Sequence, residues 1–221
     1  MNIPTSYILT VCGLERTLPV LQVAPDLSIA SFVILGDTEL VCRTAPELVK
    51  KLPPIDVLIT AEAKGIPLVF EVSRLLGMNY IIARKSVKPY MQDPLTIEVH
   101  SITTQKKQTL CLDGKDAAVI RGKRVAIIDD VISTGESVAA VERLVCQAGG
   151  VVVARAAILA EGDAANRDDI LFLAPLPLFP HQGFSYFWIT CAKWLIPSTV
   201  IPFVLICQGL RLASGGVRRS S

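Results

Sequence analysis

The chain has 221 residues, and its 22 Lys and Arg nearly balance its 20 Asp and Glu, which gives a formal net charge of +2. This balance, without a basic stripe, excludes a nucleic-acid-binding domain that relies on neutralising phosphates. The six cysteines form no Cys-x-x-Cys pair, and most of them lie in apolar runs. Since the N-terminus also lacks a secretory signal pattern, we expect buried free thiols in a reducing, cytoplasmic environment.

The chain divides into three regions by composition. Residues 1–36 contain several prolines and are rich in predicted strand. Residues 37–180 are long enough to bury one α/β core, with a first short helix expected over Pro46–Leu52. Residues 181–221 form a hydrophobic C-terminal extension.

A buried strand, a small-residue turn and a helix are predicted in succession after the first helix. The strand is Ile55–Thr60, the turn is Ala61–Gly65, and the helical stretch is Ile66–Leu76. Taken alone, this segment is also compatible with an ordinary strand-to-helix connection.

Positive charges follow the next predicted strand, Tyr80–Ala83. Arg84 and Lys85 come directly after it, and Lys88 lies three residues further on. Because the carboxyl ends of parallel strands meet at one edge of a sheet, we expect these cations near any other ligand-binding turns of the sheet. The alternating segment Thr96–Leu112 then predicts a hairpin with a polar tip.

The most informative pattern is found in residues 125–137. Val125–Ile128 is apolar and β-branched, as expected of a strand buried on both faces of a parallel sheet. Asp129 and Asp130 follow it and should lie at the strand's carboxyl end, where open α/β sheets bind ligands. A helical period begins at Gly135, so the preceding turn should open a helix whose free N–H groups attract anions.

The residue types in this turn fit a sugar phosphate. Backbone amides with the hydroxyls of Ser133, Thr134 and Ser137 can surround a phosphate, and Gly135 permits close approach of the chain. Two adjacent carboxylates accept hydrogen bonds from the vicinal hydroxyls of a ribose. A Walker B strand is the alternative, but the chain has no Gly-x-x-x-x-Gly-Lys-Ser/Thr segment to accompany it.

This stretch resembles the phosphoribosyl pyrophosphate signature of the type I phosphoribosyltransferases. The resemblance implies a Rossmann-like α/β fold, an open and mostly parallel sheet flanked by helices, with residues 1–36 as a small hood over the base. It also implies that Asp129 and Asp130 are the catalytic residues. The residues expected to bind the ribose and its 5-phosphate are Asp129, Asp130, Val131, Ile132, Ser133, Thr134, Gly135, Glu136 and Ser137.

The earlier turn is similar to the Glu-Ala-Arg-Gly turn of the adenine and xanthine branch of this family. The resemblance places a cis peptide bond between Glu62 and Ala63. It implies that pyrophosphate is bound by two groups of residues, the turn and the cations after the next strand: Glu62, Ala63, Lys64, Gly65, Arg84, Lys85 and Lys88.

Two departures from the adenine enzymes concern the base. Thr104 falls nearest to the position of a glutamate in their flexible loop, and the N-terminal segment lacks their Phe-Lys/Arg-Asp element. The base-binding residues therefore stay unassigned.

The resemblance implies transfer of ribose 5-phosphate from phosphoribosyl pyrophosphate to a purine base, with release of pyrophosphate. Mg²⁺ is expected to accompany phosphoribosyl pyrophosphate and to be held mainly by that ligand, without dedicated protein ligands. By analogy we expect a cytoplasmic homodimer.

A regulator that senses phosphoribosyl pyrophosphate without catalysis is the alternative. The segment Glu62–Leu68 is similar to the corresponding turn of the purine repressor group. Those regulators carry a basic N-terminal winged helix, whereas Arg16 is the sole basic residue in the first 36 positions here.

The hydrophobic extension has three interpretations. Residues 194–210 carry no charge, which is compatible with a membrane anchor, but Pro197 and Pro202 interrupt them. A packing or oligomer contact is the second interpretation. We favour the third, an incidental extension beyond the end of the domain, because the segment lacks polar periodicity and capping signals.

Overall fold

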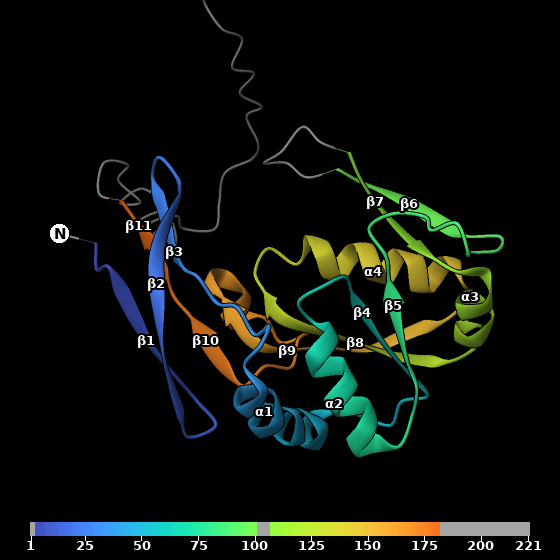
Figure 1. Ribbon diagram of the computed structural model, residues 1–221, viewed down its shortest axis with the longest axis horizontal. Coiled ribbons are helices and arrows are strands. Elements are labelled where there is room, and N and C mark those ends of the chain that lie inside the picture. The colour runs from blue at the N-terminus through green and yellow to red at the C-terminus, as the bar shows by residue number, and fades with distance from the viewer. Residues whose placement is uncertain (1–2, 101–106, 182–221) are drawn as a thin grey trace, which may run out of the picture. The chain divides into compact units, whose positions relative to one another are not determined.

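Two β-sheets and a β-hairpin organise residues 3–100 and 107–181, which this computed structural model describes (Figure 1). The larger sheet has the strand order β10-β9-β8-β4-β5 and is parallel throughout. The smaller sheet has the order β1-β2-β3-β11 and is antiparallel. The predicted α/β class with a central parallel sheet is confirmed.

The parallel strands are short apolar segments with both faces covered. In the central strand, Val125–Ile128 are each at most 2% exposed. Burial on both faces explains why this strand is a continuous apolar run without alternation. The strands are β4 (Val57–Ala61), β5 (Tyr80–Ala83), β8 (Arg124–Ile132), β9 (Val151–Glu161) and β10 (Ala174–Leu176).

Helices cover the two faces of the parallel sheet separately. Helices α1 (Thr38–Lys51) and α2 (Ile66–Leu76) pack with Ala126 and Ile128 of β8 in one hydrophobic cluster. Residues of α3 (Gly114–Ile120) and α4 (Glu136–Gln147) pack with Val125 and Ile127 in the other. Alternation along β8 therefore supplies both cores, and Figure 1 shows α1 and α2 on the opposite side of the sheet from α4.

The antiparallel sheet lies beside β10, at one edge of the parallel sheet (Figure 1). Its strands are β1 (Ser6–Val11), β2 (Leu14–Ala24), β3 (Leu27–Ala30) and β11 (Leu178–Pro180). An ion pair joins it to the core, because Arg16 of β2 donates from Nε to Asp37 Oδ2 at 2.7 Å. Asp37 is also the N-cap of α1 and accepts from the amide of Leu40.

The Arg16→Met variant is expected to be less stable than the wild type, by a few degrees in Tm. The guanidinium lowers the pKa of Asp37, so this pair stabilises the fold above the carboxylate's ordinary pKa and is lost as pH falls through the lowered one. Thermal unfolding at neutral and at acidic pH measures the effect. Lys50→Met, which breaks an exposed pair with Glu47, is the matched control and should change Tm much less.

After β10 the chain returns to the antiparallel sheet as β11, which the sequence analysis did not anticipate. Leu178 pairs with Ile29, and His181 Nε2 lies 2.8 Å from the hydroxyl of Ser28. Strand β11 thus belongs to the same sheet as the N-terminal strands.

A truncation after His181 is therefore expected to leave the unfolding temperature within a degree or two of the full chain. Truncation after Pro177 removes β11 and should lower the unfolding temperature clearly, because β3 loses one of its two partner strands. Comparing the two truncated chains by thermal unfolding separates the extension from the fold. Equal losses in both would contradict the proposal that residues 181–221 are incidental.

The structure corrects two predicted boundaries. Helix α1 begins at Thr38, eight residues before the predicted start, and contains Pro46 in its interior. Burial of Leu40, Ala45 and Leu48 on its inner face offsets the missing amide of the proline. Strand β8 continues to Ile132. Asp129 and Asp130 therefore belong to the C-terminal part of the strand and do not follow it.

The remaining expectations have mixed outcomes. The hairpin is confirmed as β6 (Leu95–His100) and β7 (Lys107–Leu112), but Thr104 lies outside the described residues. Four cysteines in the described part are free thiols; Cys111 is buried as expected, whereas Cys42 and Cys146 are exposed.

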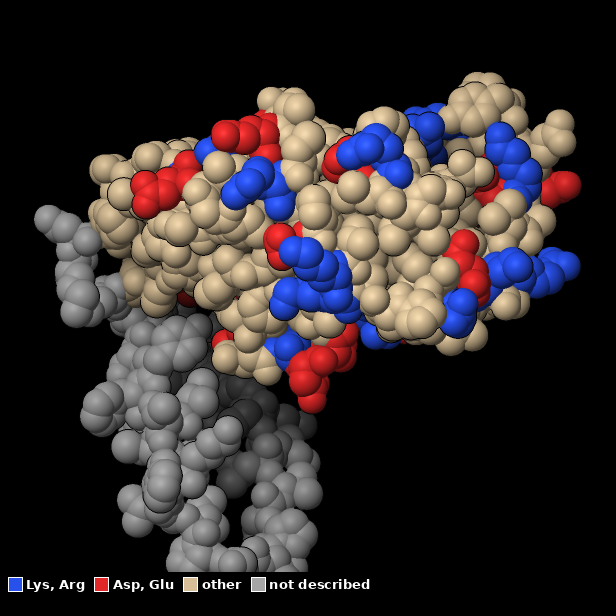
Figure 2. Space-filling view, turned by 90° about the horizontal axis from the view of Figure 1, so that it is seen from below, with Lys and Arg blue, Asp and Glu red and all other residues tan. Residues whose placement is uncertain are grey.

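The surface carries mixed charges where it can be seen. On the face in Figure 2, Lys and Arg lie among Asp and Glu without separate regions of either sign. Within residues 3–100 and 107–181, no helix is long and apolar enough to cross a membrane. The predicted extension, apart from residue 181, lies outside the described residues.

Candidate active site

Three strand ends of the parallel sheet meet around one cavity of about 210 Å³. Its walls are formed by the turn after β4, by Lys85 after the end of β5 and by the two carboxylates of β8. Residues of α4 and β7 complete the lining. The lining residues are Ala61, Glu62, Ala63, Lys64, Lys85, Leu110, Asp129, Asp130, Val131, Ser137 and Ala140. Residues from both predicted motifs are therefore adjacent in space, although about 65 positions separate them in the sequence.

The two carboxylates of β8 have different surroundings. Asp130 is only 3% exposed, and its Oδ2 lies 3.1 Å from Lys64 Nζ. That buried oxygen accepts no well-aligned hydrogen bond from a described residue. Asp129 is partly exposed and accepts from the amide of Asp130 through Oδ1 at 2.9 Å. Burial, and then the charge of Asp130, raise the pKa of Asp129 well above its ordinary value of 3.8.

The raised pKa of Asp129 has a consequence for stability. The native state holds the Asp129 proton more tightly than the unfolded chain, so stability decreases as pH rises from about 4 through the raised pKa. Asp129→Asn should therefore be more stable than the wild type at neutral pH, by a few degrees in Tm, and about equally stable near pH 4. Thermal unfolding across this range measures the difference.

Asp56→Asn provides a control of opposite sign. Arg124 lowers the pKa of Asp56 at the other end of the sheet, so this variant should be less stable than the wild type at neutral pH. A Tm difference for Asp129→Asn that does not change with pH would contradict the assigned cause.

The turn after β4 is held tightly against β8. The bond between Glu62 and Ala63 is cis, as the resemblance implied. A Cβ at Gly65 would lie 2.2 Å from Thr60 Oγ1 and 3.2 Å from the carbonyl oxygen of Ile128. Glycine is therefore required there for the turn to pack beside the carboxylates.

Glu62 connects this turn to the end of β5. Its carboxylate accepts from the amide of Lys85 at 3.1 Å and lies 3.4 Å from Arg84 Nη1. The Lys85 amide and then the nearby cations lower the pKa of Glu62. Glu62 thus orders the neighbouring cationic segment, and its own negative charge is unsuited to direct contact with an anion.

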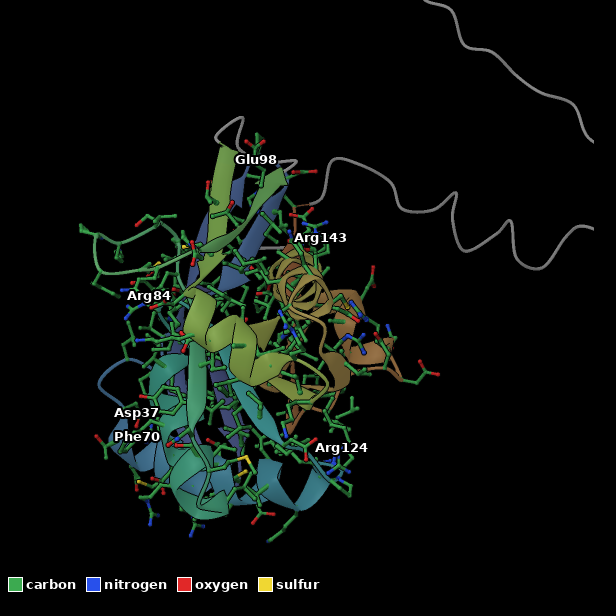
Figure 3. The ribbon with its side chains drawn as sticks, turned by 90° about the vertical axis from the view of Figure 1, so that its right-hand side faces the viewer. Asp37, Phe70, Arg84, Glu98, Arg124 and Arg143 are labelled. Atoms are coloured by element: carbon green, nitrogen blue, oxygen red, sulfur yellow. The ribbon has the colours of Figure 1, made fainter. Side chains whose placement is uncertain are left out.

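The structure separates the predicted cations into two groups. Lys64 and Lys85 line the cavity. Arg84 instead lines a neighbouring cavity of about 280 Å³ together with Tyr80 and Tyr90, and Lys88 donates to Ser86 Oγ at 2.7 Å. Figure 3 shows Arg84 near the end of the core that carries the hairpin. Successive side chains of an extended chain point to opposite faces, which explains why Arg84 and Lys85 diverge.

A second hollow of about 110 Å³ adjoins the first at the start of α4. It is lined by Asp129 and the continuous segment Val131–Val138. Gly135 has φ of +83° and, as the N-cap of α4, has no side chain to cap the helix. The amide of Glu136 donates to Thr134 Oγ1 at the long distance of 3.4 Å, so the N-terminal end of α4 still presents amide groups toward this hollow. All residues predicted for phosphate binding therefore lie around this hollow or next to it.

A family model for the phosphoribosyl transferase domain matches residues 52–174. The chain belongs to this phosphoribosyltransferase family. The match covers the turn after β4, both carboxylates and the loop before α4. The expected family is thus confirmed from an independent comparison.

Relatives of the phosphoribosyltransferase are named as enzymes for several purines. A hypoxanthine/guanine phosphoribosyltransferase of Methanococcus voltae is 32% identical over 140 residues, which are 63% of this chain and 71% of that one. A xanthine phosphoribosyltransferase of Chloroflexus aurantiacus is 30% identical over 125 residues, 56% of this chain and 58% of that one. Neither of these two is named as a regulator.

Solved structures support the fold of the phosphoribosyltransferase. The adenine phosphoribosyltransferase of Thermoanaerobacter pseudethanolicus superposes with a TM-score of 0.55 and 22% identity, over 77% of this chain and 95% of that one. The enzyme from Rhodothermus marinus gives 0.55 and 23%, over 78% and 94%. At this identity the likeness concerns the fold and not the base.

Mg²⁺ fits the phosphoribosyltransferase as a companion of its substrate. The described residues include no group of three or more His, Cys, Asp or Glu side chains arranged to hold a metal. Asp129 and Asp130 are a single pair, and Mg²⁺ is often bound by one or two carboxylates together with substrate phosphates. Asp130 Oδ2, which has Lys64 as its nearby cation but accepts no well-aligned hydrogen bond from a described residue, is compatible with a ligand that brings its own cation or hydroxyl donors.

The sequence analysis did not assign several residues around this phosphoribosyltransferase site, among them Leu110 and Arg167. Leu110 of β7 lines the cavity of about 210 Å³, and only the observed packing of the hairpin reveals it. Arg167 contacts the loop before α4 from a different part of the chain. Glu161 is the last residue of β9, and burial raises the pKa of its carboxyl.

Proposed function

We propose that this phosphoribosyltransferase transfers ribose 5-phosphate from phosphoribosyl pyrophosphate to a ring nitrogen of a purine base. The observation that carries the proposal is the shared cavity, in which Lys64 and Lys85 face the two carboxylates beside the phosphate loop. The purine class follows from relatives named for hypoxanthine, guanine and xanthine. These bases share an oxygen at C6, so we expect a 6-oxopurine to be a better substrate than adenine.

Different residues around the cavity bind different parts of phosphoribosyl pyrophosphate. The free amides and hydroxyls of the loop 131–137 bind the 5-phosphate. Asp129 and Asp130 accept hydrogen bonds from the two ribose hydroxyls and orient the ring. Lys64 and Lys85 offset the charge of the pyrophosphate at the other end of the cavity.

The reaction breaks the bond between the anomeric carbon and a pyrophosphate oxygen. Pyrophosphate leaves with the bonding electrons, a base nitrogen forms the new bond to that carbon, and the base loses its N–H proton. Positive charge develops on the ribose ring, as in glycoside hydrolysis, and the nearby carboxylates stabilise it. Bound Mg²⁺ would supply further positive charge to the pyrophosphate.

Two further parts of the proposal concern the whole molecule. Residues 1–36, whose described part contributes β1, β2 and β3 to the antiparallel sheet, are proposed as the hood that excludes water above the base. We also propose a cytoplasmic homodimer, because relatives of this fold commonly associate. Molar mass by light scattering tests the second point, and a monomer under assay conditions would overturn it.

Pyrophosphate release tests the function directly. Purified chain, Mg²⁺ and phosphoribosyl pyrophosphate are combined with hypoxanthine, guanine, xanthine, adenine or uracil in separate reactions. Release that depends on a 6-oxopurine is expected. Tight binding of phosphoribosyl pyrophosphate without release for any base would instead favour the sensing regulator.

A further inference from the structure

Arg167 brings a positive charge to the phosphate loop from a distant part of the chain. It directly follows the 3₁₀ helix η1 (Gly162–Asn166), which follows β9. A Cβ built on Gly135 would lie 2.5 Å from Nη1 of Arg167. The guanidinium therefore packs against the backbone of the loop at its left-handed residue.

A carboxylate fixes the orientation of this guanidinium. Nε and Nη2 of Arg167 donate to the two oxygens of Asp169 at 2.8 and 2.7 Å. Arg167 is half-buried. Its Nη1 donates a hydrogen bond to none of the residues that the structure describes. The bidentate pair thus uses one edge of the guanidinium and leaves the other edge facing Gly135.

To bind a 5-phosphate, the segment 129–137 needs a cation from another part of the chain. Residues 129–137 contain Asp129, Asp130 and Glu136 but no Lys or Arg. A phosphate monoester carries up to two negative charges, and the hollow is lined by two acidic side chains, Asp129 and Glu136, whose charge opposes binding. Lys64 and Lys85 line the other cavity, which we assign to pyrophosphate, and not the hollow of the loop.

We propose that Arg167 is a positioning residue for the 5-phosphate: held by Asp169, it fixes the loop at Gly135 and offsets the charge of the bound monoester. This inference rests on the proposed function. It predicts a selective effect, because Arg167 acts on the loop and not on the pyrophosphate cavity. The contribution is electrostatic in part, so it should weaken with ionic strength.

The test measures binding of ribose 5-phosphate and of pyrophosphate with Mg²⁺ to the full chain by calorimetry. Arg167→Met should raise the Kd for ribose 5-phosphate about five- to tenfold and leave the Kd for pyrophosphate within about twofold. Arg167→Lys, which restores the charge without the fork, should recover part of the loss. The difference between Arg167→Met and wild type should shrink at high salt.

Arg124→Met is the matched control. Arg124 makes the same type of bidentate pair, with Asp56, but at the first residue of β8 (Figure 3). It should lose a similar amount of stability without a change in either Kd. If Arg167→Met does not fold, Arg167→Gln removes the charge and the fork but keeps a polar N–H donor at this position, and the same selective loss is expected.

Two results would overturn the inference alone. One is an unchanged Kd for ribose 5-phosphate in a folded variant at Arg167 while the wild type binds it. The other is an equal loss for both ligands, which indicates a purely structural role. A wild-type chain that binds neither ribose 5-phosphate nor phosphoribosyl pyrophosphate would overturn the proposed function as well.

Discussion

Replacing both Asp129 and Asp130 by asparagine is expected to abolish measurable transfer and to weaken phosphoribosyl pyrophosphate binding by roughly 10²- to 10⁴-fold. Each carboxylate loses a charge-assisted hydrogen bond to a ribose hydroxyl, worth about 1.5–3 kcal/mol. Asparagine keeps the shape and can still accept the amide hydrogen bond of residue 130. Equilibrium binding and steady-state turnover are the measurements.

Asp56→Asn is the control for this double variant. It removes a carboxylate from the same sheet, but at the edge opposite the cavity, where Asp56 pairs with Arg124. Binding by this control should match the wild type. Unchanged affinity in the double variant would contradict the placement of the ribose against these carboxylates.

Lys64→Met is expected to have the second largest effect, a loss of roughly 10- to 100-fold in kcat/KM. Lys64 lines the cavity, and its Nζ lies 3.1 Å from the buried Oδ2 of Asp130. Its removal leaves a buried charge without its nearby cation and takes a positive charge from the pyrophosphate. Lys85→Met should lose activity as well, but without the added loss of stability.

The Lys88→Met variant tests whether Lys88 binds pyrophosphate, as the resemblance implied, or lies away from it, as the structure indicates. The resemblance grouped Lys88 with the pyrophosphate-binding residues, whereas its Nζ donates to Ser86 and does not line the cavity. Its kcat/KM should stay within about threefold of the wild type. A loss as large as that of Lys64→Met would show that Lys88 reaches the pyrophosphate in the complex.

The strand, turn and helix that contain residues 125–137 were predictable because several local signals agree. A strand buried on both faces, two acidic residues and a small-residue turn follow one another without interruption in residues 125–137. Both predicted boundaries of helix α2, Ile66 and Leu76, are confirmed. Pro67 suits the first turn of a helix, and Gly77 ends the helix in a left-handed conformation.

The errors have physical causes that a local pattern does not contain. Pro46 was taken as a helix start, although α1 begins at Thr38 and tolerates the proline through buried packing. The pyrophosphate-binding role assigned to both Arg84 and Lys85 stays a prediction, and the structure adds that the two side chains line different cavities. The contact of Arg167 with Gly135 joins residues 32 positions apart, and only the fold brings them together.

The measurement that tests the central claim most directly is pyrophosphate release by the wild type, with and without a purine base. The proposed reaction predicts release that requires Mg²⁺, phosphoribosyl pyrophosphate and a 6-oxopurine together, and that disappears in the Asp129→Asn, Asp130→Asn double variant. Binding of phosphoribosyl pyrophosphate with no release for any purine would contradict it.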